Sequence, residues 1–440
     1  MKRVLLLALS IALCYSTTVA ASKLEKNRNK VLSASQGYYK DIFMDGGIHL
    51  TSRRTLSAAG ALSLTMDHFA SAPTTELTAT DTLLQRQIFC GYAEDTNGWL
   101  LYPDGAPRYR LIYVNGGSAA KHAISLTPEG RKHIQEFVAA GGSYLGTCAG
   151  ASLGSAGSKR IGKNDIRNRK LYLHLWPSIM HGTGLRKSYT AMRLEPKSPL
   201  LKYYDFGKDM IIDSVRHNGG GYALEEPSTP LPDGTEVLTR YVFENKEKVQ
   251  INNQISAWAY KPNSQSGRTI LIGSHPEGVQ KGERRDYMAA MILYAMEANP
   301  QPKLKAELQI GSTRSMTCKT EDNSPDFTRI GDKQYHHFTI SVPKKCQSIT
   351  ITLNGYKGED NFDLVLCAQY GSHAFVNNSQ FVANNPGCYK EITITNPKAG
   401  KWFVSVLCTT TVTAISNKYG TEYIKNTNVL NGVPYSITVK

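Results

Sequence analysis

The residues with the clearest chemical potential are a cysteine and a histidine that lie far apart in the sequence. Cys148 lies in Gly146-Thr147-Cys148-Ala149-Gly150, directly after the apolar pair Tyr144-Leu145. Glycines two residues before and after a nucleophile allow the tight strand-to-helix turn that exposes its side chain. The start of the following helix would favour a thiolate. The same pattern also fits a small buried cysteine in a glycine-rich turn, so the motif needs a partner.

The partner histidine follows a second predicted strand. Thr269-Ile270-Leu271-Ile272-Gly273 is an apolar, β-branched run that predicts a buried strand, and it leads into Ser274-His275-Pro276-Glu277-Gly278. A histidine two residues before a glutamate supplies a general base and a carboxylate that orients it. Cys148, His275 and Glu277 therefore predict a catalytic nucleophile, base and orienting acid in that chain order.

These two motifs resemble the class I glutamine amidotransferase-like superfamily, whose members carry a G-x-C-x-G elbow and a distal H-P-E. The chain is most similar to the branch known as the biotin-protein ligase N-terminal domain, over residues 30–298. This resemblance implies an oxyanion hole built from the backbone N–H groups of Gly117 and Ala149. The other stretches that carry the resemblance are Val114-Asn115-Gly116-Gly117, Phe137-Val138-Ala139-Ala140-Gly141-Gly142 and His217-Asn218-Gly219-Gly220-Gly221.

Four further residues are predicted to contact a substrate. Gly116 ends a predicted strand, where open α/β sheets place ligands. His217 and Asn218 open the second glycine-rich loop, and His181 begins His181-Gly182-Thr183-Gly184. For both glycine loops, a turn without chemistry is the alternative. We expect no cofactor and no metal, because no cysteine pair has the C-x-x-C spacing of a zinc site.

Alternating strands and helices predict the fold of the first domain. Strands are predicted at 41–44, 110–114, 209–213, 255–260 and 269–273, with 171–176 as a further strand around His174, and helices at 55–66, 127–140 and 283–298. Such alternation is typical of a doubly wound (flavodoxin-like) α/β sheet, here with a nucleophile elbow at Cys148.

A second domain is predicted after the stiff linker Asn299-Pro300-Gln301-Pro302. Short alternating runs at 337–342, 348–353, 362–366, 391–395, 402–407 and 435–439 predict an antiparallel β-sandwich. It is loosely similar to the domains appended to secreted bacterial peptidases. Glu359, Asp360 and Asp363 are either solvated turn carboxylates or calcium ligands. We therefore expect domains at residues 22–300 and 303–440.

The N-terminus predicts export. Residues 1–21 carry Lys2-Arg3, an apolar run from Val4 to Leu13 and small residues near the end, as in a secretory signal peptide. The apolar run is too short for a transmembrane segment and no second one follows, so a periplasmic or secreted protein is expected. In an oxidising compartment some cysteines can pair, with the connectivity left open. They are Cys90, Cys318, Cys346, Cys367, Cys388 and Cys408.

Charge and motifs together define the expected activity. The net charge is +15, but the Lys and Arg residues are scattered, which predicts a solvated basic surface and no nucleic-acid partner. Glutamine amidotransferases usually carry Gly-His-Gln after the nucleophile, whereas this chain has Gly150-Ala151-Ser152 and no synthase domain. We therefore expect a cysteine hydrolase acting on an amide-type bond of a small molecule or peptide. The alternative is a non-catalytic envelope binding protein that retains the amidotransferase-like fold and contacts an envelope or glycan surface through its C-terminal domain.

Overall fold

The computed structural model describes residues 22–34, 36–45, 56–69, 97–356, 362–417 and 420–440. The predicted signal peptide, Cys90, Glu359 and Asp360 lie outside these residues. No helix in these ranges is long and apolar enough to cross a membrane.

The first part of the chain forms a mixed sheet whose parallel strands carry the residues of interest. The parallel strands follow the order β2 (Met66–Phe69), β1 (Lys40–Asp45), β3 (Tyr109–Val114), β4 (Ser143–Thr147) and β13 (Thr269–Ile272). Because parallel strands end at the same edge, the residues that follow β3, β4 and β13 come together there.

Mostly antiparallel strands extend this sheet beyond β13. They are β5 (Ser158–Lys159), β6 (Ile166–Arg167), β7 (Met180–Gly182), β8 (Ser188–Leu194), β9 (Ile211–His217), β10 (Gly221–Ala223), β11 (Thr235–Val242) and β12 (Ile255–Tyr260). β12 pairs with β13, and only β5 and β7 pair in parallel among these added strands of the described chain. The added strands place their loops around the end of the parallel core.

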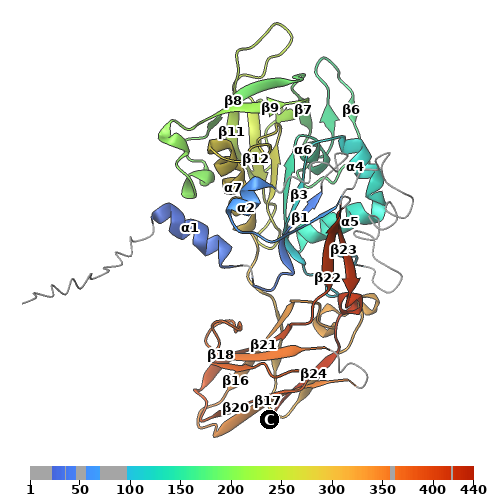
Figure 1. Ribbon diagram of the computed structural model, residues 1–440, viewed down its shortest axis with the longest axis vertical. Coiled ribbons are helices and arrows are strands. Elements are labelled where there is room, and N and C mark those ends of the chain that lie inside the picture. Colours follow the sequence, from blue (N-terminus) through green and yellow to red (C-terminus); the bar gives the residue numbers. More distant parts are fainter. Residues whose placement is uncertain (1–21, 35, 46–55, 70–96, 357–361, 418–419) are drawn as a thin grey trace, which may run out of the picture.

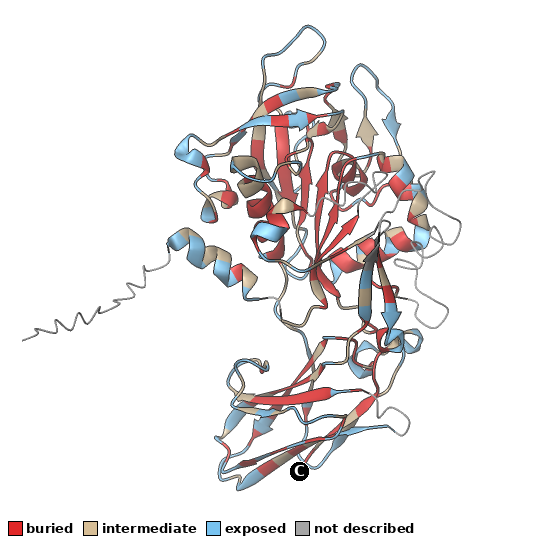
Figure 2. Cartoon of the chain, in the orientation of Figure 1, coloured by how far each residue is buried: buried red, intermediate tan, exposed pale blue. Residues whose placement is uncertain are grey.

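Helices cover both faces of the sheet (Figure 1). Alternate residues of β3 point into different cores, with Ile112 and Val114 in one and Leu111 and Tyr113 in the other. The first core includes α4 (Ala119–Ser125), α5 (Thr127–Ala139) and α6 (Ala149–Gly154), and the second includes α1 (Lys23–Leu32), α2 (Ser57–Ala61) and α7 (Glu283–Met296). Figure 2 shows the buried strands between these layers.

The C-terminal part forms a β-sandwich. One sheet has the order β14 (Leu304–Leu308), β16 (Tyr335–Val342), β21 (Gly400–Cys408), β18 (Leu364–Tyr370), β19 (Phe381–Ala383), and the other β15 (Thr313–Met316), β24 (Tyr435–Val439), β17 (Ser348–Gly355), β20 (Lys390–Thr395). The pairs are antiparallel except that β14, which directly follows the linker, runs parallel to β16. The short 3₁₀ helices in the described residues are η2 (Pro199–Lys202), η3 (Phe206–Lys208), η4 (Thr320–Asp322), η5 (Pro325–Phe327) and η6 (Thr427–Asn431).

A hairpin of β22 (Thr413–Asn417) and β23 (Gly420–Lys425) reaches from the sandwich to the first sheet (Figure 1). Tyr423 stacks on Trp99 with ring centroids 4.0 Å apart. Next to this contact, the buried Arg108 side chain donates from Nε and Nη2 to the Asp332 carboxylate at 3.2 and 2.8 Å. A buried charge needs its partner, so the C-terminal part completes the packing around Arg108.

Three predicted elements differ from the structure. The helix expected at 55–66 is only Ser57–Ala61, because Met66 already starts β2 beside β1. Residues 171–176 form no strand. Their backbone instead contacts α6, where Leu173 N–H donates to the Leu153 carbonyl at 2.8 Å. His174 is exposed. The strand expected at 209–213 is β9, which starts later and runs to His217.

Candidate active site

The backbone at Cys148 is strained in the way that a tight strand-to-helix turn requires. Cys148 lies between β4 and α6 with φ +49° and ψ −103°. A non-glycine residue rarely adopts a positive φ, and such residues concentrate at functional sites. Its N–H still donates to the Ile272 carbonyl at 2.9 Å, which ties the turn to the end of β13.

The two glycines around Cys148 are required by close backbone contacts. A Cβ on Gly146 would overlap the backbone of Gly150, and a Cβ on Gly150 would overlap the carbonyl oxygen of Val114. Gly150 N–H also donates to the Asn115 carbonyl at 3.2 Å. The helix after Cys148 can therefore approach β3 only because these positions lack side chains.

His275 and Glu277 lie on the loop after β13. His275 Nδ1 is 2.8 Å from Glu277 Oε1, and their side chains are only 20% and 18% exposed. The backbone of His275 donates to the Arg216 carbonyl at 2.9 Å. The imidazole is therefore held from both the side chain and the main chain.

The structure brings Cys148 beside His275. Burial alone would lower the pKa of His275, but hydrogen bonds with the Cys148 and Glu277 side chains, together with their charges, raise it to about 10. These interactions therefore favour the protonated imidazole. Cys148, which is 6% exposed, lies next to a cation that attracts negative charge onto sulfur.

The segment after β3 closes the other side of the site. Gly116 packs so tightly on the His275 ring that a Cβ there would overlap Cε1. Gly117 is exposed and has φ +145°, a conformation that favours glycine. In the described chain, the Gly117 and Ala149 amides donate no hydrogen bond within the protein. Their role as oxyanion donors stays a prediction.

The second glycine loop supports His275 from behind. Gly221 N–H donates to the Gly273 carbonyl at 3.2 Å, and a Cβ on Gly220 would overlap that carbonyl. His217 is fully buried and bonds Thr190 Oγ1 through Nε2 at 2.8 Å. Burial and the charge of His275 lower the pKa of His217 to about 4, although a hydrogen bond with the Gly219 backbone acts in the opposite direction. His217 is therefore a neutral residue of the site's wall.

Asn218 and His181 face more open surroundings. Asn218 is exposed next to the loop glycines. His181 is half-buried, and its ring lies 5.6 Å from that of Tyr222. Burial and the charge of Lys159 lower its pKa, against the charge of Glu226. Contact of either side chain with a substrate stays a prediction.

Two residues that contact His217 were not predicted from the sequence. Thr190 binds His217, and Tyr241 donates to the Gly221 carbonyl at 2.8 Å with its ring 5.2 Å from that of His217. Burial, together with the charges of Tyr287 and Cys148, raises the pKa of Tyr241 well above its usual value. They come from β8 and β11, whose register with distant strands leaves no signal in a single sequence.

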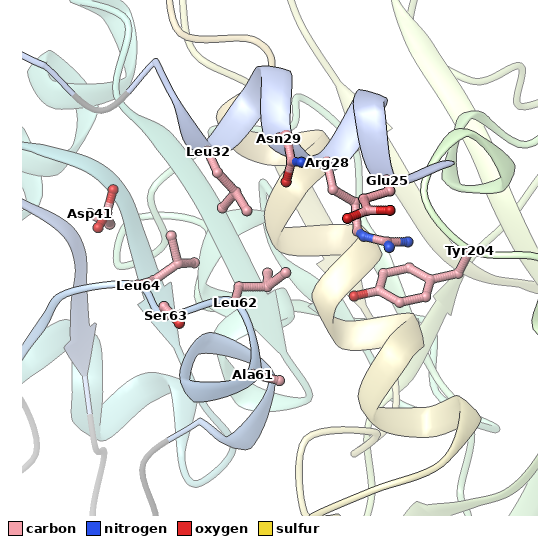
Figure 3. A pocket seen from close by; sticks show the side chains of 10 residues that line it. All are labelled: Glu25, Arg28, Asn29, Leu32, Asp41, Ala61, Leu62, Ser63, Leu64 and Tyr204. Atoms are coloured by element: carbon pink, nitrogen blue, oxygen red, sulfur yellow. The ribbon is translucent and has the colours of Figure 1, made fainter. Parts of the chain in front are cut away.

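A second concave region lies away from the residues described above. A pocket of about 580 Å³ lies between α1, α2, the start of β1 and Tyr204, and neither Cys148 nor His275 lines it (Figure 3). Its Arg28 donates to the Tyr203 carbonyl at 2.7 Å, and Asp41 accepts from Thr65. No three His, Cys, Asp or Glu side chains of the described chain gather to hold a metal ion.

Family comparisons agree with the motifs. Residues 106–309 match the family model described as "Biotin-protein ligase, N terminal", and residues 334–407 match "Bacterial pre-peptidase C-terminal domain". Both resemblances expected from the sequence are thereby confirmed. The mixed α/β region is therefore similar to the N-terminal part of biotin-protein ligases, and the β-sandwich that follows it is similar to bacterial pre-peptidase C-terminal domains. No curated protein matches the chain.

Solved structures resemble separate parts of the chain. The pre-peptidase C-terminal domain of a Bacillus anthracis collagenase is 14% identical, covers 32% of this chain and 99% of its own, and has a TM-score of 0.20. A glutamine amidotransferase is 15% identical over 42% of this chain and 80% of its own, with a TM-score of 0.28. A ThuA-like protein from Bacteroides uniformis is 9% identical over 58% and 92%, with a TM-score of 0.35. At these values the solved structures say nothing about the activity of this chain.

Proposed function

We propose that the protein is an exported cysteine hydrolase that cleaves an amide-type bond through Cys148, His275 and Glu277. The observation that carries the proposal is that Cys148 lies beside His275, whose Nδ1 is 2.8 Å from Glu277 Oε1, at a strained turn that only glycine neighbours permit. A buried structural cysteine needs neither a positive φ nor a protonated imidazole beside it.

The mechanism follows from the protonated state of His275. Cys148 Sγ attacks the carbonyl carbon as a thiolate, and the N–H groups of Gly117 and Ala149 stabilise the oxyanion. The imidazolium gives its proton to the leaving amine as the C–N bond breaks, which leaves a thioester and a neutral imidazole. That imidazole then takes a proton from water, and the resulting hydroxide attacks the thioester carbon. The C–S bond breaks, which releases the acid product and restores the Cys148 thiolate. Glu277 keeps the ring oriented throughout.

Finer features of the fold belong to the same proposal. The strand order β2-β1-β3-β4-β13 supports a flavodoxin-like, doubly wound sheet, and the turn at Cys148 supports a nucleophile elbow. We take residues 22–300 and 303–440 as the two domains. The second is of a kind found in bacterial peptidases, which supports a periplasmic or secreted location and a role in binding an envelope or glycan surface.

Hydrolysis of a mixed pool of peptide amides, followed by mass spectrometry, tests this function. We expect products with the wild-type chain, none with Cys148→Ala, and wild-type yield with Cys318→Ala, which removes a half-buried thiol far from the motif. Products that persist in Cys148→Ala would contradict the proposal. No product with the wild-type chain would favour the non-catalytic binding protein.

A further inference from the structure

The Lys and Arg residues, which we expected to be scattered, are partly clustered beside the candidate active site. Between Ser158 and Ser188 the sequence holds eight Lys or Arg residues and a single acid, Asp165, which amounts to seven of the chain's net +15 charges. We call these side chains the basic wall: Lys159, Arg160, Lys163, Arg167, Arg169, Lys170, Arg186 and Lys187. Figure 2 shows the β5–β6 hairpin that carries part of the basic wall as an exposed element.

The positive charges of the basic wall are not neutralised by acidic side chains of the described residues. Seven of its side chains are exposed and Lys159 is half-buried. None takes part in an ion pair within the described residues, whereas Arg240, in the same sheet, pairs with both Glu195 at 2.6 Å and Glu225 at 3.0 Å. Eight cations held together without partners repel one another, and an anionic ligand would relieve that repulsion.

Backbone contacts connect the basic wall to His275. β5 pairs with β7 so that Lys159 lies opposite His181, and the hairpin residue Ile161 packs on Gly184. In the next layer, Thr183 N–H donates to the Gly220 carbonyl at 3.1 Å. Gly220 itself packs on the Gly273 carbonyl, two residues before His275. The basic wall is therefore the outer layer of one side of the site.

A contact with α6 also connects the strand beside the basic wall to the helix that follows Cys148. Ser152 Oγ lies 3.5 Å from Met180 Sδ, one helical turn after Cys148 and one residue before His181. In Figure 1, β6 and β7 lie at the end of the first domain that is remote from the C-terminal sheets. A ligand that reaches Cys148 from this side therefore crosses the basic wall first.

We infer that the basic wall binds the carboxylates of an acidic peptide and directs its amide bond to Cys148. The exposed apolar side chains Ile161, Ile166 and Tyr189, which are 47%, 39% and 59% exposed, lie among the cations. Mixed cationic and apolar surface fits a peptide with acidic and apolar side chains better than a uniformly charged polymer. The inference rests on the proposed function, and it names the substrate class of that site.

Two alkylating agents that differ in charge test this inference separately from the proposed function. Iodoacetamide is neutral and iodoacetate is an anion, so the ratio of their rates at Cys148 reports the local electrostatic potential. We compare the wild-type chain with a variant that combines Lys159→Gln, Arg160→Gln, Arg186→Gln and Lys187→Gln. The rate is followed at Cys148 by peptide mass spectrometry. The matched control removes four exposed lysines of the C-terminal part by Lys344→Gln, Lys401→Gln, Lys425→Gln and Lys440→Gln.

The expected outcome is a change in one ratio only. Loss of the basic wall lowers the iodoacetate-to-iodoacetamide ratio about threefold or more at low salt, and added salt lowers the wild-type ratio as well. The iodoacetamide rate stays the same, and the control variant keeps the wild-type ratio. An unchanged ratio with a normal iodoacetamide rate would overturn the basic wall alone. An inert Cys148 in the wild-type chain would instead overturn the proposed function.

Protection of the thiol identifies the ligand class. Hexaglutamate should slow iodoacetamide at Cys148 in the wild-type chain and the control variant but not in the basic-wall variant, and hexalysine should have no effect. Stronger protection by a single-stranded oligonucleotide than by hexaglutamate would overturn the assignment to an acidic peptide.

Discussion

At the scale of single residues, the site depends on backbone positions that tolerate no side chain. Cys148 has φ +49°, and the helix that follows it touches β3 through Gly150. Gly116 has the same function on the other side, because it lets the backbone approach the His275 ring. The Cys148 thiol and the His275 imidazole are thus brought together by these close approaches.

Gly150→Ala tests this close approach. The new Cβ would overlap the Val114 carbonyl oxygen, so we expect a loss of about 1–3 kcal/mol in the free energy of unfolding. Cys148 alkylation should slow as well, because the turn moves. Gly60→Ala is the matched control: no atom lies within 4 Å of its Cβ position in α2, and alanine favours a helix. Equal stability of the two variants in urea would contradict the account.

His217 predicts a pH effect on stability. Its pKa is lowered to about 4 in the folded chain, below the ordinary value near 6.5, so the unfolded chain binds a proton first as pH falls. Stability is therefore lost between pH of about 6.5 and 4, by up to about 3 kcal/mol. In His217→Gln this part of the loss should disappear. Parallel stability curves for the two chains over this range would contradict the assignment.

At the scale of elements, the hairpin of β22 and β23 supports the first domain. Tyr423 is buried against Trp99, and its hydroxyl lies 2.7 Å from that of Tyr109. Tyr423→Ala should lower the free energy of unfolding by about 3 kcal/mol, as for other buried aromatic residues. Ile424→Ala, the next residue and 45% exposed, should have an effect within about 0.5 kcal/mol. Similar losses in denaturant unfolding of both variants would show that the hairpin does not stabilise the first domain.

The sequence predicted those elements whose signal is local. β3, β4 and β13 are apolar runs of buried strands, so Cys148, His275 and Glu277 could be placed at one edge of a sheet. Thr190 and Tyr241 could not, because β8 and β11 reach the site through antiparallel pairings set by tertiary packing. The helix expected at 127–140 is found as α5 (Thr127–Ala139), because its start and end signals are local.

At the scale of the whole molecule, the two parts are joined by a buried charge pair. The sequence predicted a linker and two domains, but the Arg108–Asp332 contact joins residues too far apart to show in a local pattern. Trp99, Leu101 and the sandwich residue Ile330 also belong to one apolar core. A chain that ends at Pro302 would leave Arg108 without its carboxylate.

Asp332→Asn tests the coupling of the two parts. The Arg108 charge would remain buried without its anion, which costs about 3–5 kcal/mol when one partner of a buried pair is lost. Asp326→Asn is the matched control, because its pair with Lys303 is exposed and 3.9 Å long and should contribute less than about 1 kcal/mol. We also expect one unfolding transition for the wild-type chain. Two well-separated transitions, or no cost for Asp332→Asn, would contradict the coupling.

The measurement that tests the central claim most directly is the rate of iodoacetamide alkylation of Cys148 across pH. At neutral pH, Cys148 should react faster than the other free thiols, including Cys367, whose pKa burial raises to about 11. His275→Ala should slow it by about tenfold or more by removing the cation beside sulfur. His174→Ala, which removes an exposed histidine, should leave the rate unchanged. An inert Cys148, or one that reacts equally fast without His275, would contradict the catalytic account.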